Sequence, residues 1–452
     1  MPAILLALGA IFLGSGCNPG QAQPGRSIIL ISIDTLRADH LGSYGYFRDT
    51  SPNLDILAEE SVFFDLCLTP IATTLPAHTS LFTGVYPIEH GLLINFKRTL
   101  KPFVPVPALR SFAQFAQERG YETAAFVSAA PVTSATGIAA GFDLFDEPDD
   151  QERRAEQTNE PLLAWIDAER KGPFLLWVHY FDPHYPYSPP APFDTRYVND
   201  EALETYLAER KIKQSVVRPI GEPVNTREVN NAYDGEILYV DQAVGRLIAR
   251  LKQRGLWEDS AVILFSDHGE SLGDHDMGGH GYIHREQLHV PLMMKIPGQE
   301  PRRVSFPMSL VDVLPTAIGL LGEQEPWSEF LAQVSGRDVL APDASPLAVF
   351  SQRSGRKRKD IEGSAYTLAT AEWKYVHEPQ QHNRLFDWKR DPFELSNVLS
   401  SHEEVVTELE AQLMRLIRAH EENAEKIGAP EPRELDPEMV EKLRALGYVG
   451  GD

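Results

Sequence analysis

Short apolar runs separated by long amphipathic stretches constrain the fold of this chain more than any other sequence feature. Runs that are apolar throughout are typical of parallel strands buried on both faces of a sheet, with helices in the connections. The clearest runs are residues 27–33, 122–127, 174–179 and 260–266. Residues 228–254 carry apolar side chains at spacings of three and four, which predicts a helix packed on the sheet. The pattern therefore predicts an α/β fold with a mostly parallel central sheet.

The sequence changes in texture after about residue 325. A connection containing Pro and Ser leads through a basic run, residues 353–359, into short strand-like segments at 366–376. Residues 402–418 then have apolar side chains on one helical face, which predicts a small antiparallel sheet with one helix. The basic run is either a solvated surface loop or a contact for an anionic polymer. The expected divisions are a main domain at 26–325, a C-terminal subdomain at 326–425 and a tail at 426–452.

The N-terminus has the layout of an export signal. An apolar run at residues 4–13 precedes Gly14-Ser15-Gly16-Cys17 and a polar segment at 18–26. The run is too short to span a bilayer, and Cys17 resembles the lipidated cysteine of bacterial lipoproteins. We expect a leader at residues 1–25 and an exported protein, periplasmic or on the cell surface, attached to the membrane by a lipid on Cys17. A trimmed or misassigned start is the alternative.

The charge balance limits the partners of the chain. It has 65 acidic and 42 basic residues, a formal net charge of −23, which excludes a broad basic surface and argues against a nucleic acid polymer as partner. An anionic substrate would have to be attracted by local cations, and metal ions are the strongest of these. Cys67, the only cysteine besides Cys17, is expected to be a small buried apolar side chain.

Carboxylates and histidines follow the apolar runs, at the edge where open α/β sheets bind ligands. Asp34 follows the first run, with Arg37 about one turn later, while Asp267-His268 follow the fourth run and His280 comes soon after. Oxygen and nitrogen ligands together suit zinc, manganese or a similar divalent ion. Asp34 by itself could instead cap a helix, so its interpretation as a metal ligand depends on the other candidate ligands at the same edge.

The third run leads to Asp182 and His184, which could bind a second metal or form hydrogen bonds within their own turn. The segment Thr74-Leu75-Pro76-Ala77-His78 places a hydroxyl just before a proline, where a helix is expected to begin. Backbone N–H groups there would stabilise a tetrahedral oxyanion, and a metal would lower the pKa of the threonine hydroxyl. A plain Thr N-cap is the alternative.

These segments resemble the sulfatase family of the alkaline phosphatase superfamily, from about Ile28 to the C-terminus. The segment at Thr74 lies where sulfatases carry C-x-P-x-R or S-x-P-x-R. Further similar segments are Ser80-Leu81-Phe82-Thr83-Gly84, Ser266-Asp267-His268-Gly269-Glu270, Val290-Pro291-Leu292, Asp312-Val313-Leu314-Pro315-Thr316, Trp373-Lys374-Tyr375 and Leu385-Phe386-Asp387. The resemblance implies an alkaline-phosphatase-like three-layer sandwich with a mostly parallel central sheet.

Three departures separate the chain from ordinary sulfatases. Sulfatases convert the motif's cysteine or serine into formylglycine, and Thr74 is no substrate for that maturation, so no formylglycine is expected. His78 replaces the motif arginine, and Thr35 replaces the second carboxylate of the usual Asp-Asp pair. The changes resemble the threonine-nucleophile branch of the superfamily, the nucleotide pyrophosphatase/phosphodiesterases, which use two zinc ions.

The resemblance implies site residues position by position. Asp34, Thr74, Asp267 and His268 would hold one divalent ion, and Asp182, His184 and His280 the other. An equally fair sulfatase-like interpretation makes His184 and His280 donors to substrate oxygens around a single ion, so one or two ions of Zn, Mn or Ca/Mg remain open. The implied catalytic residues are Thr74, His78, His184 and His280, and the implied substrate-binding residues are Arg37, His184 and His280.

The resulting hypothesis is a metal-dependent hydrolase of a small-molecule or glycan-linked anionic ester. Hydrolysis of a phosphate mono- or diester through a covalent threonyl intermediate is favoured, because a sulfated threonine lacks the aldehyde elimination route of sulfatases. The alternatives are a sulfuric ester hydrolase acting without formylglycine and a non-catalytic binding protein on the same scaffold.

Overall fold

A computed structural model describes residues 25–95, 99–100, 103, 106–149, 152–217, 223–344, 348–354, 363–428 and 433–434. The predicted leader with Cys17, residues 355–359 of the basic run and most of the predicted tail lie outside these ranges and stay predictions. Within the described ranges, no helix is both long enough and apolar enough to cross a membrane.

The core of the protein is an eight-stranded sheet in the order β15-β2-β14-β10-β1-β7-β5-β6. The strands from β10 to β6 are parallel, whereas β14 runs antiparallel to both of its neighbours. In sheet order they span Arg302–Val304, Val62–Phe64, Leu292–Lys295, Ala261–Ser266, Ile28–Ile33, Phe174–Tyr180, Glu122–Phe126 and Leu144–Asp146. The four predicted runs form β1, β5, β7 and β10, which confirms the mostly parallel sheet.

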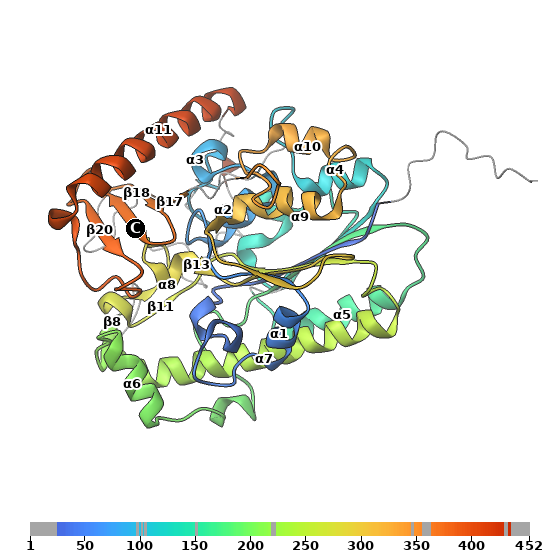
Figure 1. The fold of residues 1–452 in the computed structure, drawn as a ribbon. Coiled ribbons are helices and arrows are strands. Elements are labelled where there is room, and N and C mark those ends of the chain that lie inside the picture. Colours follow the sequence, from blue (N-terminus) through green and yellow to red (C-terminus); the bar gives the residue numbers. More distant parts are fainter. Residues whose placement is uncertain are drawn as a thin grey trace, which may run out of the picture.

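Helices cover both faces of this sheet (Figure 1). One face packs against α2 (Thr74–Thr83), α4 (Phe112–Glu118), α9 (Val313–Leu321) and α10 (Ser328–Gln333). The other packs against α1 (Pro52–Glu59), α5 (Ala155–Asp167) and α7 (Thr226–Gln253), the last being the helix predicted at 228–254. Successive residues of β1 enter opposite cores, as the two-residue period of a strand requires. The three-layer sandwich is confirmed.

A smaller antiparallel sheet follows in the C-terminal part. Its strands are β17 (Val349–Arg353), β18 (Ala365–Ala369), β19 (Trp373–His377) and β20 (Arg384–Asp387). Helix α11 (Glu403–Ile427) lies across this sheet, with Leu409 and Leu413 buried between them (Figure 1). The predicted pairing of a small sheet with one helix is confirmed, and the sheet itself begins at Val349.

The remaining described helices and strands are short. They are α3 (Pro87–His90), α6 (Glu201–Glu209), α8 (Arg285–Leu288), β3 (Cys67–Leu68), β4 (Thr99–Leu100), β8 (Ser215–Val217), β9 (Pro223–Asn225), β11 (Ser271–Leu272), β12 (Gly278–Gly279), β13 (His289–Val290), β16 (Met308–Ser309) and β21 (Arg433–Glu434), besides turns of 3-10 helix. Cys67 is fully buried in β3 and burial raises the pKa of its thiol, so its expected role as an apolar core residue is confirmed.

Candidate active site

Two neighbouring strands bring the first set of predicted ligands together. Strands β1 and β10 are paired in parallel with Ile33 opposite Ser266, so the residues that follow them leave the sheet side by side. Asp34, Asp267 and His268 are fully buried, and one ligand atom from each lies within 4.8 Å of the others. Their meeting at the carboxyl ends of adjacent parallel strands follows directly from the sheet topology.

The charges in this cluster favour a cation. Both carboxylate oxygens of Asp34 and Oδ2 of Asp267 are buried without a hydrogen-bond partner. Burial raises the pKa of Asp34 although nearby histidines oppose the shift, and burial together with the charge of Asp34 raises the pKa of Asp267. Buried carboxylates without partners are rare, and such oxygens suit a hard or borderline divalent ion. The residues present therefore fit a metal ion.

The ring of His268 is oriented to bind the same metal ion. Its Nδ1 donates to the carbonyl oxygen of Gly269 at 2.9 Å, which leaves Nε2 directed at the carboxylates. Nε2 lies 3.4 Å from Asp267 Oδ2 and 3.8 Å from Asp34 Oδ1. Burial alone would lower the pKa of His268, but the two carboxylates outweigh it and raise that pKa. The cluster thus draws positive charge to the position of Nε2.

Thr74 completes this arrangement from the start of α2. Its Oγ1 lies 3.3 Å from His268 Nε2, and the residue is fully buried. The N-cap of α2 is Thr73, so the N-cap alternative for Thr74 is wrong. The backbone N–H of Leu75, in the first turn of the helix, donates to Asn95 Oδ1 at 2.8 Å and so fixes the start of the helix. The Thr74 hydroxyl is therefore directed at the cluster and does not cap the helix.

His78, one turn along α2, lies beneath the cluster. Its Nδ1 donates to the carbonyl oxygen of Thr74 at 2.9 Å and lies 3.8 Å from Asp267 Oδ2, while its Nε2 is buried without a partner. Burial lowers the pKa of His78 to about 4, so the ring is neutral at pH 7. A neutral imidazole therefore stands at the position where the sulfatase motif has a permanently charged arginine.

His179 belongs to the same cluster but was not among the predicted site residues. It is fully buried in β7, and its Nε2 lies 3.4 Å from Asp34 Oδ2. Burial lowers its pKa to about 4. A histidine that ends an otherwise apolar buried run is the signal that could have identified it.

His184 and His280 lie beside the first cluster. The ring of His280 is centred 4.3 Å from that of His268 and 5.7 Å from that of His184. His184 stacks on Phe181 and has a buried Nε2 without a hydrogen-bond partner, while its Nδ1 contacts the carbonyl oxygen of Tyr185 at 2.7 Å. Both rings are thus near enough to the carboxylate cluster to face a ligand bound there.

Asp182 is directed elsewhere. Its Oδ2 accepts a hydrogen bond from the backbone N–H of Ala155 at 2.9 Å, at the first residue of α5. The set Asp182, His184 and His280 is not among the groups of three metal-ligating side chains found within the described residues. The geometry favours a structural role for Asp182, with a hydrogen bond to α5 in addition to the contacts within its own turn that the alternative predicted.

Arg37 and Thr35 also point away from the cluster. The Arg37 guanidinium is 1% exposed and binds Asp39 at 2.8 Å and Asp274 at 2.7 Å, so its donors are engaged within the protein. Thr35 has a φ of 53°, and its Oγ1 donates to the carbonyl oxygen of Pro183 at 2.6 Å. The expected contact of Arg37 with substrate therefore has no geometric support, because a buried guanidinium paired with two carboxylates is not free to bind an anion.

Comparison with known proteins identifies similar hydrolases. Residues 26–323 match the Sulfatase family. The multifunctional alkaline phosphatase superfamily protein PehA of Trinickia caryophylli is 24% identical, over 82% of this chain and 91% of its own. The ulvan-active sulfatase of Formosa agariphila is 26% identical, over 87% of this chain and 81% of its own.

The fold has a close counterpart among solved structures. The phosphonate monoester hydrolase of Agrobacterium radiobacter superposes with a TM-score of 0.69 at 22% identity, covering 87% of this chain and 96% of that chain. The expected alkaline-phosphatase-like sandwich is confirmed.

Proposed function

The chain belongs to the sulfatase family, and we propose that it hydrolyses phosphate mono- or diesters through a covalent intermediate on Thr74. It is a hydrolase acting on ester bonds, and the family is metal-dependent. The observation that carries the proposal is the position of Thr74 Oγ1, buried and 3.3 Å from His268 Nε2 in a cluster of carboxylate oxygens without hydrogen-bond partners.

Asp34, Thr74, Asp267 and His268 would hold the divalent ion. When bound, it supplies positive charge that lowers the pKa of the Thr74 hydroxyl and offsets the charge of the ester oxygens. Thr74 Oγ1 attacks phosphorus, the bond from phosphorus to the leaving oxygen breaks, and the hydroxyl proton of Thr74 ends on the alcohol that leaves. Water then attacks the threonyl ester at phosphorus, which restores the hydroxyl and releases inorganic phosphate from a monoester substrate or a phosphate monoester from a diester.

The surrounding histidines would orient and neutralise the ester. His184 and His280 are proposed as donors to the non-bridging oxygens, because His280 lies against His268 and His184 lies beside His280. His78 is proposed to act indirectly: it holds the carbonyl oxygen of Thr74 and so positions the nucleophile. This arrangement supports one ion at the site, with the histidines of the second predicted set acting on substrate.

Phosphorus is favoured over sulfur on chemical grounds. A phosphothreonine can be cleaved by water at phosphorus, whereas a sulfothreonine has no aldehyde through which sulfate could be eliminated. The likeness to the phosphonate monoester hydrolase of Agrobacterium radiobacter supports turnover of phosphorus esters. A sulfate ester of a glycan is the second candidate, favoured by the likeness to the ulvan-active sulfatase.

A matched substrate panel tests the proposal. Aryl phosphate, phosphodiester, phosphonate and sulfate esters with one common leaving group should be assayed with the wild type, Thr74→Ala and Thr74→Ser. We expect the phosphorus esters to be preferred, Thr74→Ala to be inactive, and Thr74→Ser to retain part of the activity. Sulfate turnover that survives Thr74→Ala would overturn the mechanism.

A further inference from the structure

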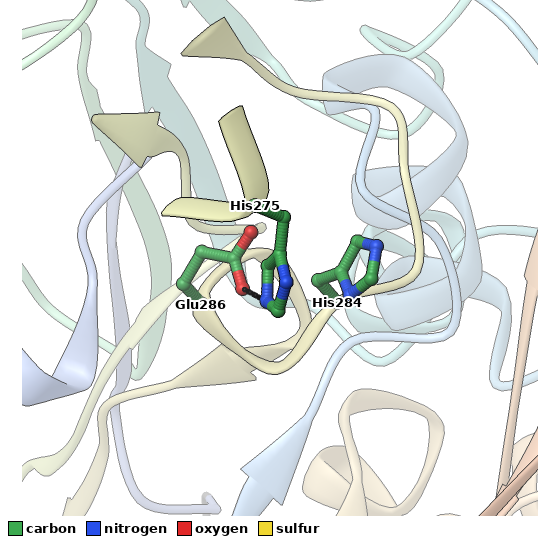
Figure 2. A group of neighbouring side chains, drawn as sticks. All are labelled: His275, His284 and Glu286. Atoms are coloured by element: carbon green, nitrogen blue, oxygen red, sulfur yellow. Dashed lines mark ion pairs between the residues drawn. The ribbon is translucent and has the colours of Figure 1, made fainter. Parts of the chain in front are cut away.

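A second group of metal-ligating side chains lies outside the candidate active site. His275, His284 and Glu286 each offer one ligand atom, and these atoms lie within 4.8 Å of one another (Figure 2). His275 belongs to a 3-10 turn at Asp274–Asp276, and Glu286 to α8. The three residues stand at the two ends of the loop that carries His280, whose ring faces the active-site cluster.

The contacts within this group leave ligand atoms available. Glu286 Oε1 accepts from Ser271 Oγ at 2.6 Å, while Oε2 lies 3.6 Å from His275 Nε2, too far for a hydrogen bond. The rings of His275 and His284 stack with centroids 3.9 Å apart and 21° between their planes.

His284 is held rigidly by the C-terminal part of the chain. Its Nδ1 lies 3.2 Å from Oε2 of Glu394, whose Oε1 accepts from Lys374 Nζ at 2.8 Å and from Trp388 Nε1 at 2.7 Å. A carboxylate that fixes a histidine ring is the usual support of a metal-binding histidine. Burial also lowers the pKa of His284 to about 3, which keeps the ring neutral.

We propose that His275, His284 and Glu286 form a second metal site of the zinc type that joins the two ends of the loop carrying His280. Two imidazoles and one carboxylate are a zinc ligand set, and water would supply the fourth ligand. Ligands at zinc distance lie about 3.3 Å from one another in a tetrahedron, and an imidazole binds through a nitrogen in its ring plane. The His275 ring therefore has to rotate out of its stack on His284 to bind the same ion. His275 is 15% exposed and lines a pocket with Arg210 and Phe393, through which an ion can enter.

The proposed role is structural and independent of the chemistry at Thr74. An ion held here would tie the 3-10 turn to α8 and restrict the loop between them. Because Glu394 lies in the C-terminal subdomain, the same ion would also stabilise the contact between that subdomain and the main sheet. The site would persist if the nucleophile were assigned to another residue.

Metal stoichiometry tests the site in the full-length protein. Chelator-treated chain is reloaded with Zn²⁺, or with Co²⁺ whose visible absorption reports four-coordination, and bound ions are counted by elemental analysis. In an Asp267→Asn background, which impairs the active-site cluster, we expect one tightly bound ion that His275→Asn or Glu286→Gln removes. Asn tolerates the left-handed backbone of residue 275, where φ is 53°. His382→Asn, an exposed histidine outside the group, is the control and should leave the stoichiometry unchanged.

A stability readout guards against unfolding of the variants. In the metal-free state of the Asp267→Asn background, His275→Asn should have the melting temperature of its parent within a few degrees, and only the parent should gain stability on addition of Zn²⁺. The site is refuted if Asp267→Asn binds no ion while remaining folded, or if His275→Asn and Glu286→Gln bind as many ions as their parent.

Discussion

The carboxylates that follow β1 and β10 differ from the one that follows β7, although all three lie at the same edge of the sheet. Asp34 and Asp267 are fully buried and keep three carboxylate oxygens free of hydrogen bonds. Asp182 uses its Oδ2 to bind the first N–H of α5. The first two carboxylates are therefore poised for a cation, and the third contributes to the helix start.

The difference shows how far sheet topology positions a side chain. Asp34 directly follows the last residue of β1 and Asp267 that of β10, so strand pairing fixes their separation. Asp182 lies two residues beyond the end of β7, where the loop and not the sheet determines its direction. Ligands are thus placed most reliably at the first residue after a parallel strand.

The largest expected effect on kcat/KM distinguishes a carboxylate of the cluster, Asp267, from the carboxylate after β7, Asp182, when each is replaced by Asn. Asp267→Asn should lower kcat/KM more than about 10³-fold and remove the active-site ion, because several kcal/mol of charge stabilisation are lost. Asp182→Asn should change kcat/KM by less than about threefold and keep the full metal content, since an amide oxygen still accepts from Ala155. Loss of an ion in Asp182→Asn would instead support the alternative in which Asp182, His184 and His280 bind a second ion.

A smaller effect on kcat is expected from replacing His184 or His280, the histidines beside the carboxylate cluster. His184→Ala and His280→Ala should each lower kcat by about 10²-fold, the usual consequence of removing one donor to a developing oxyanion. Metal content, measured on the same samples, should not change. A reduced number of bound ions would instead identify these histidines as ligands.

The smallest expected effect is on stability. Burial raises the pKa of Asp182 to about 6, so between pH 4 and 6 the folded state retains a proton that the unfolded state releases. The stabilisation present below pH 4 is therefore lost as pH rises through 6. Asp182→Asn does not titrate, so its free energy of unfolding relative to the wild type should increase from pH 4 to pH 8. Denaturant titrations at both values measure this, and an equal difference at each pH would contradict the shift.

Much of the fold could be predicted from the sequence, because buried parallel strands have an unmistakable apolar pattern. Strands β2, β14 and β15, on the antiparallel side of the sheet, were not predicted, since runs of three or four residues carry too little pattern. The core of the active-site cluster followed from the residues after β1 and β10 together with the family resemblance.

The rest of the site depends on three-dimensional contacts. His179 is recognisable as a histidine in an apolar strand, but its contact with Asp34 after the neighbouring strand is visible only in the fold. Arg37 follows β1, as the site requires, but its guanidinium is paired with Asp39 and Asp274, the latter 237 residues away in the chain. Neither the direction of a loop side chain nor a distant ion pair is encoded in local spacing.

Trapping the covalent intermediate tests the central claim most directly. Wild-type protein mixed with an aryl phosphate, quenched in acid during turnover and digested should yield the peptide containing Thr74 with one added phosphoryl group, absent from Thr74→Ala. Turnover of phosphate esters by Thr74→Ala at the wild-type rate, or a phosphoryl group mapped to another residue, would contradict the assignment of Thr74 as the nucleophile.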